Sequence, residues 1–305
     1  MTRRADWRDL ARAARLALGR TIAVGAMAAL PAGPAWAGPG QAVAPAPTRV
    51  VYPSAPQVGD HRGDFYIELL RLALAKSDGR FQVVGSTDPS MASRAFVRLA
   101  RHEGVDVIWA PTTREFEHDY RAVRVPLDKG LLGWRLLLVR RDDLARFAKV
   151  ATGAQLRALR AGLAAEWSDT QVLRDNGLPV VTASLYDNLF PMLAAQRFDY
   201  FPRGVAEIVD EQRAHPEFAI EPRLVLHYPA CTYFFVARDN ERLAAQIELG
   251  LRRALQDGAF EKLFDFYNGD AVRAAGLEQR RVLELRNTVE PPGCAAPPLV
   301  RKARR

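Results

Sequence analysis

The clearest pattern of apolar and polar positions in this chain lies between residues 228 and 267. Residues 231–237 form an apolar run rich in aromatic and β-branched side chains, which predicts a buried strand. Asn240 follows as a good helix N-cap, and the next apolar residues recur every four positions, which predicts an amphipathic helix. Those positions are Leu243, Ile247, Leu251 and Leu255. Gly258 ends that helix, and a second apolar face is expected from Phe260, Leu263, Phe264 and Phe266.

Before residue 140, strand patterns alternate with helix patterns. The expected strands cover residues 49–52, 81–84, 105–110 and 121–126, and the expected helices begin at Asp64 and Ser90. A strand–helix–strand–helix–strand order predicts a parallel sheet. The apolar residues 131–139 suit a segment that crosses from one lobe to another.

A second, similar cycle begins near Thr152. The expected strands cover residues 161–165, 179–182 and 198–201, and the expected helix caps are Ser168 to Thr170 and Ser184, with a kink at Pro191. Two α/β lobes are therefore predicted. Lobe one is discontinuous and covers residues 49–133 and 232–288, and lobe two covers residues 134–231.

The N-terminus is typical of an exported protein. Six arginines precede an apolar run at 21–30, and Ala35-Trp36-Ala37 resembles a cleavage site, so residues 1–37 are predicted to be a signal peptide. The apolar run is about half of the ~20 residues that a membrane span needs, which favours cleavage over the alternative of an uncleaved anchor. Residues 38–48, rich in proline and alanine, are expected to be a linker. The predicted location is the periplasm.

The formal charge of +8 is located at the two ends of the chain. The predicted signal peptide carries a net +4, from six arginines and two aspartates, and the basic tail at 289–305 ends in Arg301, Lys302, Arg304 and Arg305. The body between them is nearly neutral. This distribution argues against nucleic acid as a partner, and the tail is expected to be solvated.

The chain has two cysteines, Cys231 and Cys294. In an exported protein, such a pair can form a disulfide, which would tie the tail to a lobe. Separate thiols are the open alternative, because Cys231 begins an apolar strand in which cysteine packs as a small hydrophobe. The spacing does not fit a zinc site, and no metal or cofactor is expected.

The block from Tyr228 to Tyr267 resembles the end of family 3 extracellular solute-binding proteins. The matching sequence segments are Tyr-Phe-Phe-Val-Ala-Arg-Asp-Asn at 233–240 and Leu-Gln-Asp-Gly at 255–258. The resemblance covers residue 49 to about residue 269. It implies the α/β, two-lobed type 2 periplasmic binding protein fold, with discontinuous lobes joined by two crossing segments that bend as a hinge.

The candidate ligand-binding residues lie where predicted strands lead into helices, because ligands of open α/β sheets bind beyond the carboxyl ends of the strands. From lobe one these are Tyr52, Ser54, Trp109, Thr112, Thr113 and Arg114, and from lobe two Trp167, Asp169, Thr170, Tyr200 and Arg203. The five aromatic strand-end residues Tyr52, Trp109, Trp167, Tyr200 and Phe201 are expected to line a pocket.

Two positions depart from the family pattern. In amino-acid-binding members, a threonine followed three positions later by arginine holds the ligand carboxylate, but Arg114 is out of register here, and a solvent-facing arginine is the alternative. Arg203 stands near the position where members place an amine-binding aspartate, and its charge favours an anionic ligand. Pairing of Arg203 with Glu207, four residues later, is the competing interpretation.

Enzyme signatures for hydrolases, phosphate-binding loops and metalloproteases are lacking, and the five histidines show no metal-ligand spacing. The expected function is capture of a small polar, amino-acid-like solute by hinge closure, in a monomer that delivers it to an ABC permease or a membrane sensor. Two alternatives stay open. One is an enzyme of the cyclohexadienyl dehydratase type, with Glu166 or Asp169 as its acid or base, and the other is a sensory binding protein without a transport role.

Overall fold

A computed structural model describes residues 46–54, 61–88, 92–289, 291 and 293–294. The expected signal peptide lies outside the described residues, as do most of the linker and most of the basic tail. The described residues belong to one compact unit. In the described ranges, every helix is too short or too polar to cross a membrane.

The first lobe contains two small sheets. The parallel pair consists of β1 (Thr48–Tyr52) and β2 (Phe81–Gly85), and the three-stranded sheet has the order β3 (Ile108–Pro111), β11 (Thr232–Val236), β4 (Arg121–Val123). The prediction of one parallel sheet is confirmed for β1 and β2 but wrong for β3, which pairs antiparallel with β11. The backbone N–H groups of Asp106 and Val107 donate to the Val51 carbonyl, which joins the two sheets.

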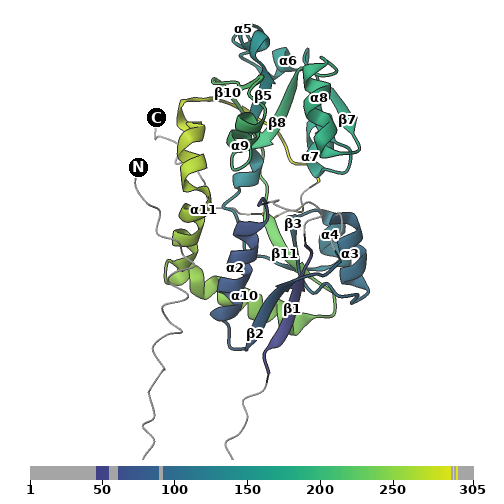
Figure 1. The fold of residues 1–305 in the computed structure, drawn as a ribbon, viewed down its shortest axis with the longest axis vertical. Helices are drawn as coiled ribbons and strands as arrows, with labels where there is room; N and C mark the ends of the chain where they lie inside the picture. Colours follow the sequence, from purple (N-terminus) through teal and green to yellow (C-terminus); the bar gives the residue numbers. More distant parts are fainter. Residues whose placement is uncertain (1–45, 55–60, 89–91, 290, 292, 295–305) are drawn as a thin grey trace, which may run out of the picture. The chain divides into compact units, whose positions relative to one another are not determined.

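Helices cover these sheets (Figure 1). They are α2 (Asp64–Ala75), α3 (Ala92–Ala100), α4 (Arg114–Asp119) and α10 (Glu241–Gln256). The next helix, α11 (Ala259–Ala275), packs against α10 and α2. The cap at Asn240 is confirmed, because its side chain accepts a hydrogen bond from Leu243 N at 3.2 Å. Two residues of the expected apolar helix faces are exposed: Leu255 is 42% exposed and Phe266 is 60% exposed.

Gly250 allows α10 to pack closely on α2. A Cβ atom at Gly250 would lie 1.7 Å from the Ala73 carbonyl oxygen, so a larger residue cannot occupy this position without moving a helix.

The second lobe is built on one larger sheet. Its strand order is β12-β10-β5-β8-β6-β7, and β9 also pairs with β5. The strands are β5 (Trp134–Arg140), β6 (Ala161–Ala164), β7 (Val180–Ala183), β8 (Tyr200–Gly204), β9 (Phe218–Ile220), β10 (Leu224–His227) and β12 (Arg281–Glu284). The helical elements are η2 (Arg141–Asp143), α5 (Leu144–Phe147), α6 (Gly153–Leu156), α7 (Ser168–Asp175), η3 (Tyr186–Asn188), α8 (Leu189–Ala194) and α9 (Ile208–Ala214).

Four local predictions in this region are wrong. Trp167, and not a polar side chain, stands at the N-cap of α7, and Ser184 precedes η3 without capping a helix. Pro191 lies in the first turn of α8, where its missing N–H group costs no helical hydrogen bond and no kink is required. Residues 281–284, assigned to lobe one by the sequence, instead form β12, which pairs parallel with β10.

Asp199 is a structural residue of this lobe. Its carboxylate accepts hydrogen bonds from Arg160 N at 2.7 Å and Arg146 Nη1 at 2.8 Å. Burial opposes ionisation of the Asp199 carboxyl, but these hydrogen bonds and the two arginine charges outweigh it and hold its pKa below the usual value.

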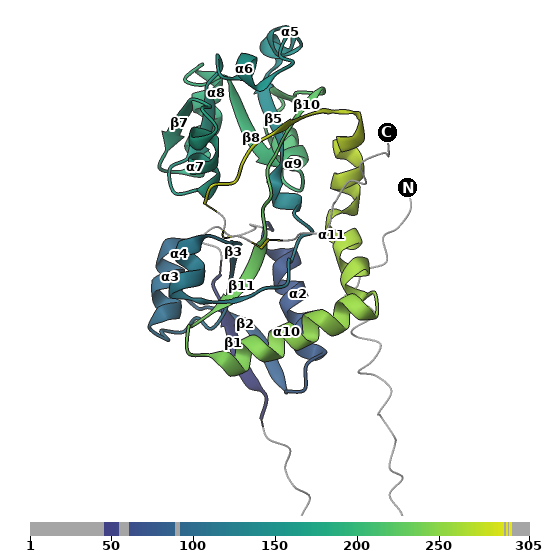
Figure 2. The same ribbon diagram turned by 180° about the vertical axis from the view of Figure 1, so that it is seen from behind.

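The chain passes between the lobes more than twice. The expected crossings are found at η1 (Leu131–Gly133) and at residues 228–231, which lie so close that a Cβ at Gly133 would be 2.0 Å from Tyr228 O. In addition, α11 and the short η4 (Leu277–Gln279) lead from the first lobe to β12 (Figures 1 and 2). After β12, the yellow chain in Figure 2 runs back toward the first lobe.

We call residues 285–289 together with Cys294 the return segment. In the second lobe, Leu285 N donates to His227 O at 2.7 Å. In the first lobe, Cys294 forms a disulfide with Cys231, with a Cα–Cα distance of 5.9 Å, which decides between the two alternatives that the sequence left open. The return segment is therefore a further connection between the lobes.

Candidate functional site

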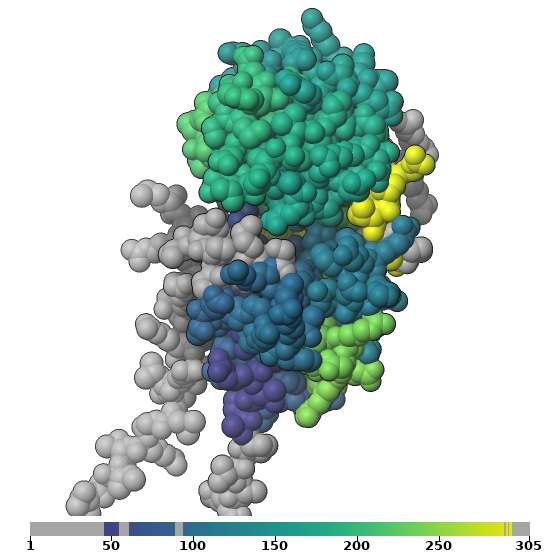
Figure 3. Space-filling view, turned by 90° about the vertical axis from the view of Figure 1, so that its right-hand side faces the viewer, coloured from purple at the N-terminus to yellow at the C-terminus, as the bar shows by residue number. Residues whose placement is uncertain are grey.

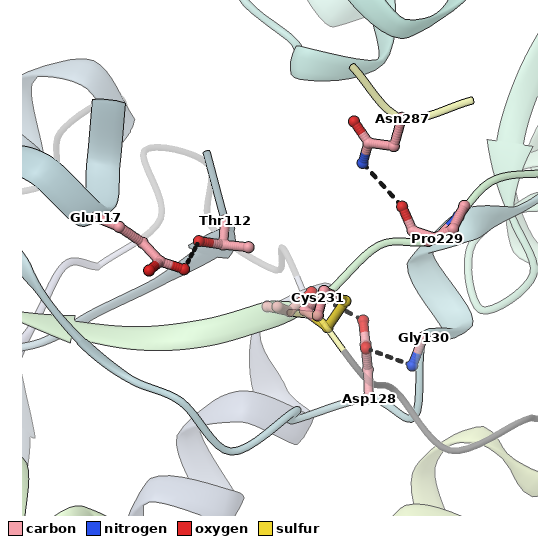
Figure 4. The surroundings of a disulfide bond; sticks show 9 residues. Thr112, Glu117, Asp128, Gly130, Pro229, Cys231 and Asn287 are labelled. Atoms are coloured by element: carbon pink, nitrogen blue, oxygen red, sulfur yellow. Dashed lines mark hydrogen bonds between the residues drawn. A yellow bond between two sulfur atoms is a disulfide. The ribbon is translucent and has the colours of Figure 1, made fainter. Parts of the chain in front are cut away.

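A pocket lies at the junction of the two lobes and the crossing segments, and we call it the hinge pocket. It is lined by Pro111 and Thr112 from the first lobe, Ser168, Asp169 and Val172 from the second, Leu132, Tyr228, Ala230 and Cys231 from the crossings, and Asn287 and Val289 from the return segment. Figure 4 shows part of this region around the disulfide, with Asn287 donating to Pro229 O and Thr112 donating to Glu117.

The acidic group of the hinge pocket is already paired within the protein. Asp169 forms an ion pair with Arg135 at 2.6 Å and accepts a hydrogen bond from the Tyr228 hydroxyl at 2.7 Å. Burial opposes the Arg135 charge, but the Asp169 carboxylate outweighs it and raises the pKa of Arg135. Burial also raises the pKa of Tyr228, so this hydroxyl keeps its proton. The three side chains form a closed network that fixes the start of α7.

The residues after β3 have local structural contacts. Thr113 caps α4 by accepting a hydrogen bond from Phe116 N at 3.0 Å, and Thr112 donates to Glu117 Oε1 at 2.8 Å. Arg114 is exposed, and its Nη1 donates to Thr288 O in the return segment at 3.2 Å. The structure thus places Arg114 against the return segment, in agreement with the solvent-facing alternative.

Arg203 lies at the centre of a group of aromatic rings in the second lobe. Its guanidinium carbon is 5.0 Å from the ring centre of Trp167, 5.3 Å from that of Tyr186 and 4.8 Å from that of Phe201. The same guanidinium pairs with Glu207 at 3.1 Å, and its Nε donates to Glu211 at 2.7 Å. The competing interpretation, in which Arg203 pairs with Glu207, is therefore confirmed, and a second carboxylate of the same lobe, Glu211, also offsets the charge of this arginine.

A matching aromatic group lies in the first lobe. The rings of Tyr66 and Trp109 are stacked at 5.7 Å, and Tyr52 lies 6.2 Å from Trp109. The Tyr66 hydroxyl lies 3.4 Å from Asp128, which also accepts a hydrogen bond from Thr232 at 2.9 Å. Tyr52 and Trp109 were predicted, whereas Tyr66 was missed because it lies within helix α2 and not at the end of a strand.

The two aromatic groups are connected by a residue that the sequence did not single out. Arg62, just before α2 in the first lobe, lies 4.9 Å from the ring centre of Tyr186 in the second lobe. Figure 3 shows one face of this junction, where the green atoms of the second lobe meet the blue atoms of the first.

The other predicted residues have internal contacts. Tyr200 is fully buried in the core of the second lobe, 6.0 Å from the ring of Phe147 and edge-on to it, so it is not placed to contact a solute. Thr170 is buried and donates to Ala164 O at 2.8 Å, and Ser54 donates to Ser86 O at 2.7 Å.

The described residues contain no group of three or more His, Cys, Asp or Glu side chains arranged to hold a metal ion.

No protein-family model and no curated protein matches the chain. Solved structures do match it. The probable amino-acid ABC transporter extracellular-binding protein ytmK of Bacillus subtilis has a TM-score of 0.54 at 16% identity, covering 74% of this chain and 99% of that one. An arginine-specific periplasmic binding protein of Salmonella typhimurium has a TM-score of 0.53 at 17% identity, covering 72% and 99%.

A third structure is the glutamate-bound GluR0 ligand-binding core of Nostoc punctiforme, with a TM-score of 0.50 at 14% identity, covering 72% of this chain and 99% of that one. At these identities the likeness shows the fold. The chain has the α/β, two-lobed type 2 periplasmic binding protein fold, which confirms the fold expected from its sequence.

Proposed function

We propose that this chain is an exported solute-binding protein that holds a small amino-acid-like solute between its two lobes. The observation that carries the proposal is an aromatic group in each lobe, with Arg62 of the first lobe lying over Tyr186 in the group of the second. Ligand sites are commonly concave, aromatic-lined and located at the junction of domains. The similar structures, which bind arginine and glutamate, support the same kind of solute.

Closure of the lobes is the step that a solute would drive. A solute stabilises the closed state only if it binds that state more tightly than the open one, which requires contacts with both lobes. Trp109 of the first lobe and Trp167 of the second are the residues that we expect to supply such contacts. The closed form would then be presented in the periplasm to an ABC permease or to a membrane sensor.

A dehydratase-type enzyme is the weaker candidate. Of its two candidate acids, Asp169 is held by Arg135 and Tyr228, and Glu166 is exposed. A general acid or base must reach the proton it transfers, and a carboxylate held in an internal ion pair is poorly suited to this role.

Thermal unfolding and intrinsic tryptophan fluorescence test the proposal. The panel is L-arginine, choline, L-glutamate, succinate and inorganic phosphate. We expect one compound to raise the melting temperature and change the emission, and Trp109→Leu and Trp167→Leu each to abolish the effect. Trp134→Phe is the control, because Trp134 packs on His227, 4.1 Å away, in another part of the second lobe. A panel in which no compound binds would contradict the proposal.

A further inference from the structure

The return segment is bound to the second lobe at its first two residues. Leu285 N donates to His227 O at 2.7 Å. Asn176, which follows α7, binds the next residue twice, because its side chain accepts a hydrogen bond from Arg286 N at 2.9 Å and donates one to Arg286 O at 2.8 Å. Since one side chain satisfies both backbone polar groups of Arg286, this residue moves together with α7.

The same segment is bound to the first lobe only a few residues later. Arg114 N, at the start of α4, donates to Val289 O at 3.2 Å, and Arg114 Nη1 donates to Thr288 O at 3.2 Å. Thr288 is the residue at which the two sets of contacts meet, because its hydroxyl also donates to Asp175 in α7. Helix α4 of the first lobe and helix α7 of the second are therefore bridged through a single residue.

The bridge leaves little slack in the chain. The carbonyl of Val289 is bound by the first lobe, whereas its side chain packs against the buried cluster of Val172, Tyr228 and Ala230. From Arg286 to Val289 the chain advances three positions, which span at most about 11 Å when fully extended. The lobes cannot separate further at this edge unless these contacts break.

The disulfide attaches the segment to the first lobe a second time, and covalently. Cys294 is bonded to Cys231, which lies directly before β11. When the hydrogen bonds from Arg114 break, the disulfide keeps the segment near α4, so they reform as an intramolecular step at a high effective concentration. Reduction of the disulfide therefore weakens the attachment even though it removes none of these hydrogen bonds.

The return segment and α11 connect the lobes at different edges. In Figures 1 and 2, the yellow chain after β12 runs beside α7, whereas α11 lies along the opposite edge of the molecule. The lobes are thus connected at two edges in addition to the crossing segments. Connections at separate edges oppose a twist of one lobe against the other and leave hinge bending as the easier motion.

We propose that the return segment is a strap that limits how far the two lobes separate, and that its disulfide with Cys231 holds the strap in place. The strap contacts belong to a state in which Arg62 of the first lobe reaches Tyr186 of the second. A state with wider separation loses these contacts, so the strap shifts the equilibrium toward the narrower state. The inference goes beyond the proposed function, because it concerns lobe motion without solute. In a solute-binding protein, the strap raises the apparent affinity, since fewer molecules occupy states too wide to bind.

Single-molecule energy transfer between dyes on the two lobes tests the strap. Maleimide dyes are attached, without a reductant, to Arg213→Cys on α9 and Arg252→Cys on α10, because these side chains are 72% and 61% exposed and pair with residues of their own helices. Thr288→Val removes the hydroxyl that donates to Asp175 and retains the disulfide. It should raise the population with lower transfer efficiency, in which the lobes lie further apart, by about threefold. Gln171→Ala is the matched control and should leave the populations unchanged, because Gln171 donates to the same carboxylate at 2.6 Å from within α7.

Dithiothreitol is the second perturbation, and the thioether bonds of the dyes resist it. It reduces the disulfide to two thiols and is itself oxidised to a cyclic disulfide. The population with lower transfer efficiency should rise further than in Thr288→Val and return on reoxidation, with wild-type far-ultraviolet circular dichroism throughout. If reduction unfolds the protein, Thr288→Val alone decides.

Two results would overturn the proposal. One is a transfer efficiency that stays the same in wild type, Thr288→Val and the reduced protein. The other is an equal rise of the wide population in Gln171→Ala, which would assign the effect to α7 and not to the strap.

Discussion

Removal of the disulfide tests how much the covalent link between the return segment and the first lobe stabilises the fold. Cys231 is fully buried directly before β11, and Cys294 belongs to the return segment, so the bond joins parts of the chain separated by 63 residues. The suitable variant is Cys294→Ser, because it breaks the bond and leaves the buried sulfur of Cys231 in place. The decrease in the free energy of unfolding then comes from the opened loop and not from a packing defect at Cys231.

The expected loss of stability follows from the length of the loop. A bridge that closes a loop of this separation lowers the entropy of the unfolded chain enough to stabilise the folded state by about 4 kcal/mol at 25 °C. Native contacts of the return segment, such as Asn287 with Pro229 O at 2.8 Å, are not removed by the substitution. The free energy of unfolding should therefore fall by about 4 kcal/mol, while the folded structure is retained.

Urea unfolding measures this loss. With a urea slope of about 2.5 kcal/mol per molar, the midpoint should fall by roughly 1.6 M. The wild-type protein treated with dithiothreitol is the control and should show the same shift. A midpoint that moves by less than about 0.2 M, equivalent to about 0.5 kcal/mol, would refute the loop-closure reasoning.

Two further predictions concern stability. Because the folded-state pKa of Asp199 lies below its usual value, this carboxylate stabilises the fold above about pH 4, and the contribution is lost as the pH falls through the folded-state pKa. In urea unfolding between about pH 2.5 and 6, the free energy of unfolding should therefore fall more steeply with decreasing pH for wild type than for Asp199→Asn. The exposed Asp187→Asn is the control and should follow the wild-type curve. Equal slopes in wild type and Asp199→Asn would contradict this. Gly250→Ala should lower the free energy of unfolding by about 1–3 kcal/mol or more, because the added methyl group would lie 1.7 Å from the Ala73 carbonyl oxygen. Gly153→Ala is the control and should be neutral or slightly stabilising, because a Cβ at Gly153 meets no atom within 4 Å. Equal melting temperatures for the two variants would argue against the close helix contact.

The strands and long helices could be predicted from the sequence because their signals are local. Asn240 and Gly258 mark the ends of α10, and the apolar run at 232–236 is long enough to identify β11. Phe266 and Leu255 were misplaced, since a helix period identifies a face but not how much of that face another element covers. The position of β12 in the second sheet depends on pairing with β10, which no pattern within 281–284 reveals.

The candidate site was less predictable, because side-chain partners in it come from distant parts of the chain. Trp109 and Trp167 could be named from their positions at strand ends. Arg203 was expected to favour an anionic ligand because of its charge, but Glu207 and Glu211, four and eight residues later, pair with it. Arg62 carries no local signal at all, and only the closeness of the two lobes brings it onto Tyr186.

A crystal structure of the protein with its tightest-binding panel compound tests the central claim most directly. The account predicts that the solute lies between the lobes, in contact with an aromatic residue of each, Trp109 or Tyr66 on one side and Trp167 or Tyr186 on the other. A solute bound outside the lobe junction, with the two aromatic groups untouched, would contradict it.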